Sequence, residues 1–157
     1  DTYYFMNQSG TIIMDGAGTD TVSAEQWSIH AYIDLRENAH SYLGTKSSLI
    51  TDPFQLSVGK SDIENALGGN GNDWLTGVSG NDHLTGGAGN DEFSIDTGSG
   101  KDIITDYTSG EDKLRLLGNL TKSELAIRQV ESDVRIKYEG DLLAIVQDTL
   151  IADLTII

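Results

Sequence analysis

Aspartates that recur every nine residues are the side chains in this sequence whose type and spacing could do chemistry. Each lies two residues after a glycine, in a stretch rich in glycine and asparagine. Carboxylate oxygens are ligands that hard divalent cations prefer, and Ca²⁺ takes six to eight oxygens at about 2.3–2.6 Å. The regular phase favours metal ligation over acid–base catalysis. The recurring aspartates are Asp73, Asp82, Asp91 and Asp102.

These aspartates belong to nine-residue units in which three positions are constant. Units begin at residues 68, 77 and 86, and a fourth begins at residue 97 after a two-residue insertion. Position four is Gly, position six is Asp and position eight is large and apolar; the apolar residues are Leu75, Leu84, Phe93 and Ile104. Residues 15–23 form an outlying unit that follows the same three rules. Recurrence at a fixed period predicts a repeat architecture.

The spacing also predicts the elements that position the carboxylates. In each unit six turn residues precede three strand residues, and the residue at position eight points inward while its neighbours point out. Two units complete one coil, so Asp73 is expected near Asp91 and Asp82 near Asp102. Rungs of a parallel sheet lie about 4.8 Å apart, and carboxylates at that separation repel unless a positive charge lies between them. Ca²⁺ is the natural candidate; a metal-free array of glycine-rich turns is the alternative, and it leaves the aspartate stack unexplained.

The composition agrees with a cation as partner. Acidic residues outnumber basic ones by 25 to 10, for a net charge of −15, and there is no cysteine. The basic surface that nucleic acids require is absent, and disulfides, thiolate zinc sites and cysteine catalysis are excluded. No apolar run is long enough for a transmembrane helix. The first residues lack the pattern of a signal peptide and are expected to be a fragment boundary.

The units resemble the nonapeptide of the repeats-in-toxin (RTX) family, which forms a Ca²⁺-filled parallel β-roll. The resemblance implies that each ion lies between two turns, with carbonyls of positions one and three from one turn, those of two and four from the other, and both aspartates. Val78 stands where the second Gly is usual, and Thr97 where the first is. The ligand positions implied are Gly68, Gly69, Asn70, Gly71, Asp73, Gly77, Val78, Ser79, Gly80, Asp82, Gly86, Gly87, Ala88, Gly89, Asp91, Gly98, Gly100 and Asp102.

The flanks narrow the resemblance to one group. Residues 11–23, 31–44 and 63–69, in that order, look like the C-terminal domain of serralysin-type secreted metalloproteases, and residues 104–116 are similar to the exit segment of those domains. In that family an aspartate turn and an Ile-Glu-Asn-Ala segment share a Ca²⁺ before the roll begins. This implies a further ligand set, in which Ala17 replaces the usual Gly: Asp15, Ala17, Gly18, Asp20, Asp62 and Glu64.

The expected fold is all-β, a right-handed parallel β-roll flanked by antiparallel strands and a short C-terminal helix. We divide one continuous domain into an N-terminal flank (1–67), the nonapeptide roll (68–105) and a β-rich cap (106–157). A capping box at residues 121–124 predicts the helix, and alternation predicts strands at 126–130, 134–138 and 142–147. Residues 153–157, an acid followed by apolar residues, are expected to be an edge strand, a secretion signal, or both.

No catalytic motif accompanies these features. The His-Glu-x-x-His zinc motif, the Gly-x-Ser-x-Gly nucleophile motif and the phosphate-binding loop are all missing. His83 lies at position seven of its unit and is expected to face solvent. Trp27, Trp74 and the tyrosines could form a sugar-binding surface, although scattered aromatic residues more often serve packing.

The sequence therefore predicts a non-catalytic Ca²⁺-binding domain of a secreted bacterial protein. From the resemblance, several Ca²⁺ ions fold it outside the cell, where it supports an N-terminal catalytic or adhesive domain of the same polypeptide that is exported by a type I secretion apparatus. Two rival functions remain: a module that binds polysaccharide or a surface, and an unrecognised enzyme.

Overall fold

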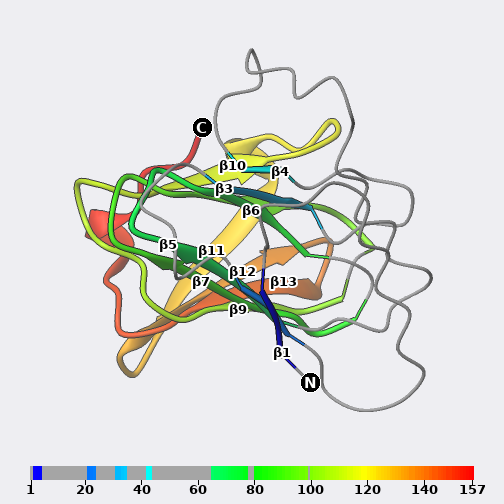
Figure 1. Ribbon diagram of the computed structural model, residues 1–157. Coiled ribbons are helices and arrows are strands. Elements are labelled where there is room, and N and C mark those ends of the chain that lie inside the picture. The colour runs from blue at the N-terminus through cyan, green and yellow to red at the C-terminus, as the bar shows by residue number, and fades with distance from the viewer. Residues whose placement is uncertain are drawn as a thin grey trace.

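The computed structural model describes residues 2–4, 21–23, 31–34, 42–43, 65–77, 80–98 and 100–157. Within these residues the strands form two sheets, which Figure 1 shows as two layers. The larger sheet has, in spatial order, β1 (Thr2–Tyr4), β2 (Thr21–Ser23), β5 (Asn65–Gly69), β7 (His83–Gly87), β9 (Asp102–Ile104), β13 (Asp141–Val146), β12 (Asp133–Tyr138) and β11 (Leu125–Val130). The smaller sheet has β10 (Lys113–Leu116), β8 (Glu92–Ile95), β6 (Trp74–Thr76), β3 (Ala31–Asp34) and β4 (Tyr42–Leu43).

Successive nonapeptides place their strands in alternate sheets, which is why two units make one coil. Strand β6 pairs in parallel with β8, and Trp74 lies beside Glu92. Strand β7 pairs in parallel with β9, and His83 lies beside Ile103 because the insertion at residues 95–96 lengthens that coil. This arrangement confirms the predicted parallel roll and places position-six aspartates of alternate units on neighbouring rungs.

The core lies between the two sheets and is filled by the position-eight side chains. Leu75, Leu84 and Phe93 are fully buried, as is Ile104 apart from 1% of its surface. Burying each such side chain contributes about 1.5–3 kcal/mol. The predicted inward position is therefore confirmed, and it places each aspartate, two residues before the apolar residue, where the turn meets the strand.

The cap continues the larger sheet instead of forming a separate body. Strands β11, β12 and β13 form an antiparallel meander, and β13 pairs in parallel with β9. Its two turns contain Glu131 and Glu139 in the left-handed region, at φ of 57° and 50°. The three predicted cap strands are confirmed to within one residue at each end.

The predicted C-terminal helix is a single 3₁₀ turn, Lys122–Glu124, and not an α-helix. The capping box that predicted it is present, with the Thr121 N–H donating to Glu124 Oε2 at 3.0 Å. A second 3₁₀ turn spans Ile151–Asp153. Strand β11 begins at Leu125, directly after the box, and leaves no room for further helical turns. No helix among the described residues has the length and apolar character needed to cross a membrane.

The last residues of the chain lie against β10. The Leu114 N–H donates to the Thr155 carbonyl at 2.8 Å, and the Ile157 N–H donates to the Leu114 carbonyl at 2.9 Å. The Tyr107 hydroxyl accepts from the Thr155 N–H at 2.9 Å and donates to the Asp112 carbonyl at 2.8 Å. The end of the chain is thus held at the edge of the smaller sheet, beside the exit from the roll, in the parallel pairing of Leu114 with Ile156.

Candidate metal centre

The four position-six aspartates are buried, although ionised carboxylates are almost never fully buried without a partner. Their exposed fractions are 2% for Asp73, 1% for Asp82, 1% for Asp91 and 5% for Asp102. Each follows the turn of its unit, and in three of the four units the position-four glycine of that turn has a positive φ: 140° for Gly80, 135° for Gly89 and 104° for Gly100. The turns therefore direct the carboxylates into the body of the roll.

The aspartates of neighbouring rungs are joined in pairs by hydrogen bonds. In each pair the backbone N–H of one aspartate donates to a carboxylate oxygen of the other. The Asp73 N–H donates to Asp91 Oδ1 at 2.8 Å, and the Asp82 N–H donates to Asp102 Oδ1 at 3.3 Å. These bonds show the predicted pairing of Asp73 with Asp91 and of Asp82 with Asp102. The result is an aspartate ladder on each side of the roll.

The second carboxylate oxygen faces a space that the position-one glycine leaves open. Asp91 Oδ2 is buried and receives no hydrogen bond from any described residue, and a Cβ added to Gly86 would collide with it. A Cβ added to Gly77 would lie 2.6 Å from Asp82 Oδ2 and 3.0 Å from Asp102 Oδ2. These cradles are lined by oxygen atoms and are closed to any side chain, which fits a small hard cation.

A backbone carbonyl joins the carboxylates at the next cradle. A Cβ on Gly68 would meet both the Gly86 carbonyl and Asp73 Oδ2. Among the described residues no three His, Asp or Glu side chains gather at one point as a ready-made ligand cluster. A cation here would therefore depend on turn carbonyls for part of its coordination, as the RTX resemblance implies.

The electrostatics of the ladder are unfavourable without a positive charge. Burial, reinforced by the charges of Asp73, Asp112 and Asp106, raises the pKa of Asp91 to about 7 against the hydrogen bond from Asp73. Burial and the charge of Asp82 raise the pKa of Asp102 to about 8. Near neutral pH these carboxyls therefore tend to keep protons, and a divalent cation between them would favour the ionised form.

Two aspartates that the repeat did not predict extend the ladder. Asp112, 2% exposed, accepts the Asp91 N–H at 2.9 Å on Oδ1 and the Thr108 N–H at 2.7 Å on Oδ2. Asp106 accepts the N–H groups of Gly86 and Gly87, each at 2.8 Å. Asp112 follows Asp91 by 21 residues, out of the nine-residue phase; the only signal in the sequence was an acid in the exit turn at residues 109–112.

The other predicted ligand positions divide into three groups. Glycines of neighbouring turns lie back to back: a Cβ on Gly87, Gly89 or Gly100 would collide with the carbonyl of Gly69, Gly71 or Gly80, respectively. Gly98 has open space around its Cβ position, and Asn70 and Ala88 are exposed in the turns. Outside the described residues lie Asp15, Ala17, Gly18, Asp20, Asp62, Glu64, Val78 and Ser79.

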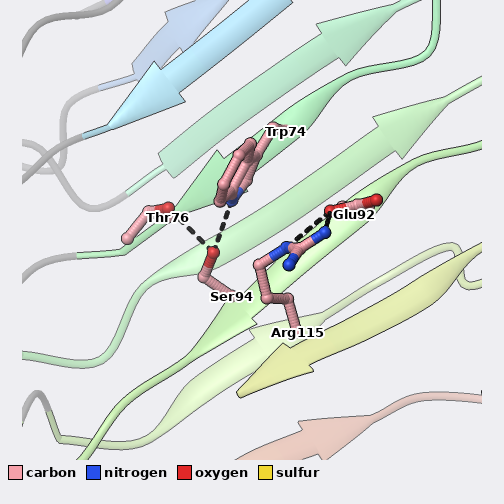
Figure 2. A network of polar contacts seen from close by, with 5 residues as sticks. All are labelled: Trp74, Thr76, Glu92, Ser94 and Arg115. Carbon is pink, nitrogen blue, oxygen red and sulfur yellow. Dashed lines mark hydrogen bonds and ion pairs between the residues drawn. The ribbon is translucent and has the colours of Figure 1, made fainter. Parts of the chain in front are cut away.

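The second predicted feature, an aromatic surface, is represented here by Trp74. Its indole N–H donates to Ser94 Oγ at 2.6 Å, and Thr76 Oγ1 donates to the same oxygen at 3.0 Å. Arg115 lies over the ring, 4.9 Å from its centroid, and pairs with Glu92 at 2.6 Å (Figure 2). These contacts tie β6, β8 and β10 together, so Trp74 serves packing; Trp27 lies outside the described residues.

The comparison with family models settles the family. Residues 4–151 match the model described as "Peptidase M10 serralysin C terminal". The chain belongs to the serralysin C-terminal family. The predicted resemblance is therefore confirmed over nearly the whole sequence. The domain corresponds to the C-terminal region of a peptidase family, and the sequence given contains no His-Glu-x-x-His motif. No curated protein matches the serralysin C-terminal domain described here.

The solved structures that are similar to this domain include a lipase and a subunit of an epimerase. The extracellular lipase LipA from Serratia marcescens matches with 16% identity and a TM-score of 0.44, over 90% of this chain and 33% of that one. The AlgE6R3 subunit of the Azotobacter vinelandii mannuronan C5-epimerase matches with 24% identity and a TM-score of 0.24, over 59% of this chain and 71% of that one. The chain thus spans about a third of the length of the lipase.

Proposed function

We propose that this domain binds several Ca²⁺ ions along its aspartate ladders and that ion binding folds it. The observation that carries the proposal is Asp91 Oδ2, a buried carboxylate oxygen with no donor among the described residues, facing the cradle at Gly86. A native fold rarely leaves such an atom without a partner. A cation at this point supplies the missing partner and offsets the repulsion between rungs.

The donor chemistry selects Ca²⁺ from the common metals. The cradles offer carboxylate and carbonyl oxygens only, the chain has no cysteine, and His83 is exposed on β7. Ca²⁺ accepts irregular shells of oxygen ligands, whereas Zn²⁺ prefers nitrogen and sulfur and Mg²⁺ requires near-octahedral geometry. We assign the carboxylate ligands to Asp73, Asp82, Asp91 and Asp102, with Asp112 added from the structure, and the remaining shell to carbonyls of the turns.

Ion-coupled folding follows from the charge. A chain of net charge −15 repels itself when its carboxylates are brought together. Binding free energy contributes to folding when the site exists only in the folded chain. Low Ca²⁺ inside a cell would keep the chain extended for export, and high Ca²⁺ outside would fold it.

This mechanism suits a non-catalytic part of a larger secreted protein. Membership of the serralysin C-terminal family supports a catalytic domain on the same polypeptide, type I export and an extracellular location. The family resemblance also supports a Ca²⁺ held by Asp15, Ala17, Gly18, Asp20, Asp62 and Glu64 at the entrance to the roll. The role of the domain would be to fold outside the cell and stabilise the attached domain.

Titration of the isolated chain with CaCl₂, followed by far-UV circular dichroism, tests the proposal. We expect a cooperative gain of β signal with CaCl₂ that MgCl₂ does not reproduce and that a chelator reverses. Asp91→Ala should move the transition to higher Ca²⁺ concentration, whereas Asp96→Ala, outside the nine-residue phase, should leave it close to the native value. A chain equally folded in chelator, or equal curves for the two variants, would overturn the assignment.

A further inference from the structure

The outer face of the antiparallel meander carries a cluster of cations in a strongly acidic domain. Arg128 on β11 and Arg135 on β12 are directly opposed cross-strand partners, and both are exposed. Lys137 lies two residues beyond Arg135 on the same face. We call the surface formed by the exposed Arg128 and Arg135 and the half-buried Lys137 the basic face.

Sheet register extends this face across neighbouring strands. Arg135 pairs with Ile145 of β13, and Ile145 pairs with Ile103 of β9. The two isoleucines are half-buried, so they leave an accessible apolar strip beside the arginines. The labels β11, β12, β13 and β9 show these strands side by side in Figure 1. The face therefore combines cations with an apolar strip, in one row across four strands.

The two arginines of the basic face lack a counter-ion within the part of the chain that the structure describes. Among the described residues no carboxylate forms an ion pair with Arg128 or Arg135, whereas Arg115 on the smaller sheet pairs with Glu92. Like charges directly opposite in an antiparallel pair, about 4.5–5.5 Å apart at Cβ, are destabilising. Glu131, Glu139 and Asp141 lie at the ends of the strands. Asp133 lies two residues before Arg135 on the same face, and its Oδ1 accepts the Asp148 N–H at 3.1 Å instead of pairing with an arginine. An external anion between the arginines would relieve the repulsion.

We propose that the basic face binds a linear polysaccharide that carries carboxylate groups. A guanidinium group binds a carboxylate through two parallel hydrogen bonds, and cations about 4.5–7 Å apart along and across strands suit a polymer with repeated charges. The strip at Ile145 and Ile103 offers an apolar surface for the sugar rings. A Debye length of about 8 Å in physiological salt screens the acidic roll from a polymer bound here.

The same observations disfavour two other occupants. A symmetric contact between two copies would place arginines against arginines, because a two-fold interface uses the same patch on both subunits. A lipid surface would need apolar side chains that protrude from the face, whereas Ile103 and Ile145 are half-buried in the sheet. A solvated, flexible polyanion brings no like charge to the arginines and needs no protruding apolar side chain.

Binding of hyaluronan, a linear polymer in which glucuronate alternates with N-acetylglucosamine, to the full chain in Ca²⁺ buffer tests the proposal by calorimetry, with neutral dextran as the control polymer. We expect binding to hyaluronan alone, weakening as salt is added. Arg128→Gln with Arg135→Gln should lower the affinity about tenfold or more, because each residue contributes charge-assisted bonds. Lys113→Gln, which removes an exposed cation from β10 of the other sheet, should change it by less than about twofold.

Circular dichroism should show that the double variant still folds with Ca²⁺ as the native chain does, so loss of polymer binding would be independent of ion-coupled folding. No binding of hyaluronan by the native chain, or an equal loss in Lys113→Gln, would overturn the proposal. Binding to phosphatidylserine vesicles without binding to hyaluronan would overturn it in favour of a lipid surface, and concentration-dependent dimers blocked by the double variant would do so in favour of self-association.

Discussion

Asp91→Asn should have opposite effects on the stability of the domain with and without Ca²⁺. The asparagine keeps the oxygen that accepts the Asp73 N–H but removes the charge that faces the cradle at Gly86. Without the ion that charge destabilises the folded chain, because the carboxyl is 1% exposed and lies among other carboxyls. With the ion the same charge is a ligand, so its removal weakens binding.

The size of the effect without Ca²⁺ follows from the pKa. A rise from 3.8 to about 7 is a difference of about three pKa units, and each unit corresponds to about 1.4 kcal/mol. At pH 8 the ionised carboxyl therefore destabilises the metal-free fold by at most about 4 kcal/mol. Part of this comes from charges that relax or are screened, so we expect Asp91→Asn to raise the free energy of unfolding by about 2–4 kcal/mol in chelator.

Urea unfolding at pH 8, followed by circular dichroism, measures both effects when it is done in excess Ca²⁺ and in excess chelator, the chelator samples containing enough of a stabilising osmolyte to fold part of the metal-free chain. The variant should be more stable than the native chain in chelator and less stable in Ca²⁺, while Asp96→Asn, in a half-exposed position, should follow the native chain in both. A variant that is less stable in both conditions would refute the reasoning, because it would show that the charge of Asp91 stabilises the fold without an ion.

Three further predictions test other parts of the account. In chelator the folded fraction should fall as pH rises from about 4 to about 8, because Asp91 and Asp102 have raised folded-state pKa values and keep protons that the unfolded chain loses; a rise of the circular dichroism β signal over the same pH series would contradict this. Gly86→Ala should lower the number of bound Ca²⁺ ions per chain by one in native mass spectrometry, because the added Cβ would collide with Asp91 Oδ2. The φ of Gly86 is not in the left-handed region, so the backbone itself accepts alanine; an unchanged ion count would refute a Ca²⁺ site beside Gly86. Tyr107→Phe should cost about 1–3 kcal/mol and speed hydrogen exchange at residues 155–157, because it removes the hydroxyl that links the Asp112 carbonyl to the Thr155 N–H; unchanged exchange would show that the link is dispensable.

The repeat predicted most of the fold and four of the six aspartates in the ladders. A fixed nine-residue period gives each position of the unit the same structural role, so the inward apolar residues and the stacked aspartates could be predicted from their positions in the unit alone. Leu75 and Phe93 are buried, and Asp73 and Asp91 are joined by a hydrogen bond, as predicted. Alternation predicted the cap strands for the same reason, since a half-buried sheet imposes a period of two.

What the sequence did not predict lies where the period ends. Asp112 and Asp106 reach the ladder through an exit turn whose shape depends on contacts across the roll, such as the Thr108 N–H that donates to Asp112. The capping box at Thr121 predicted a helix, but strand pairing of β11 with β12 took the residues that would have extended it. The basic face was also missed, because it requires the register that places Arg128 opposite Arg135.

A high-resolution crystal structure of the chain grown in ample Ca²⁺ tests the central claim most directly. The account predicts an ion beside Gly86 that contacts Asp91 Oδ2, with others repeated along both ladders and turn carbonyls completing each shell. Ladders with no ion between the turns, and Asp91 Oδ2 satisfied by a water molecule or a proton instead, would contradict it.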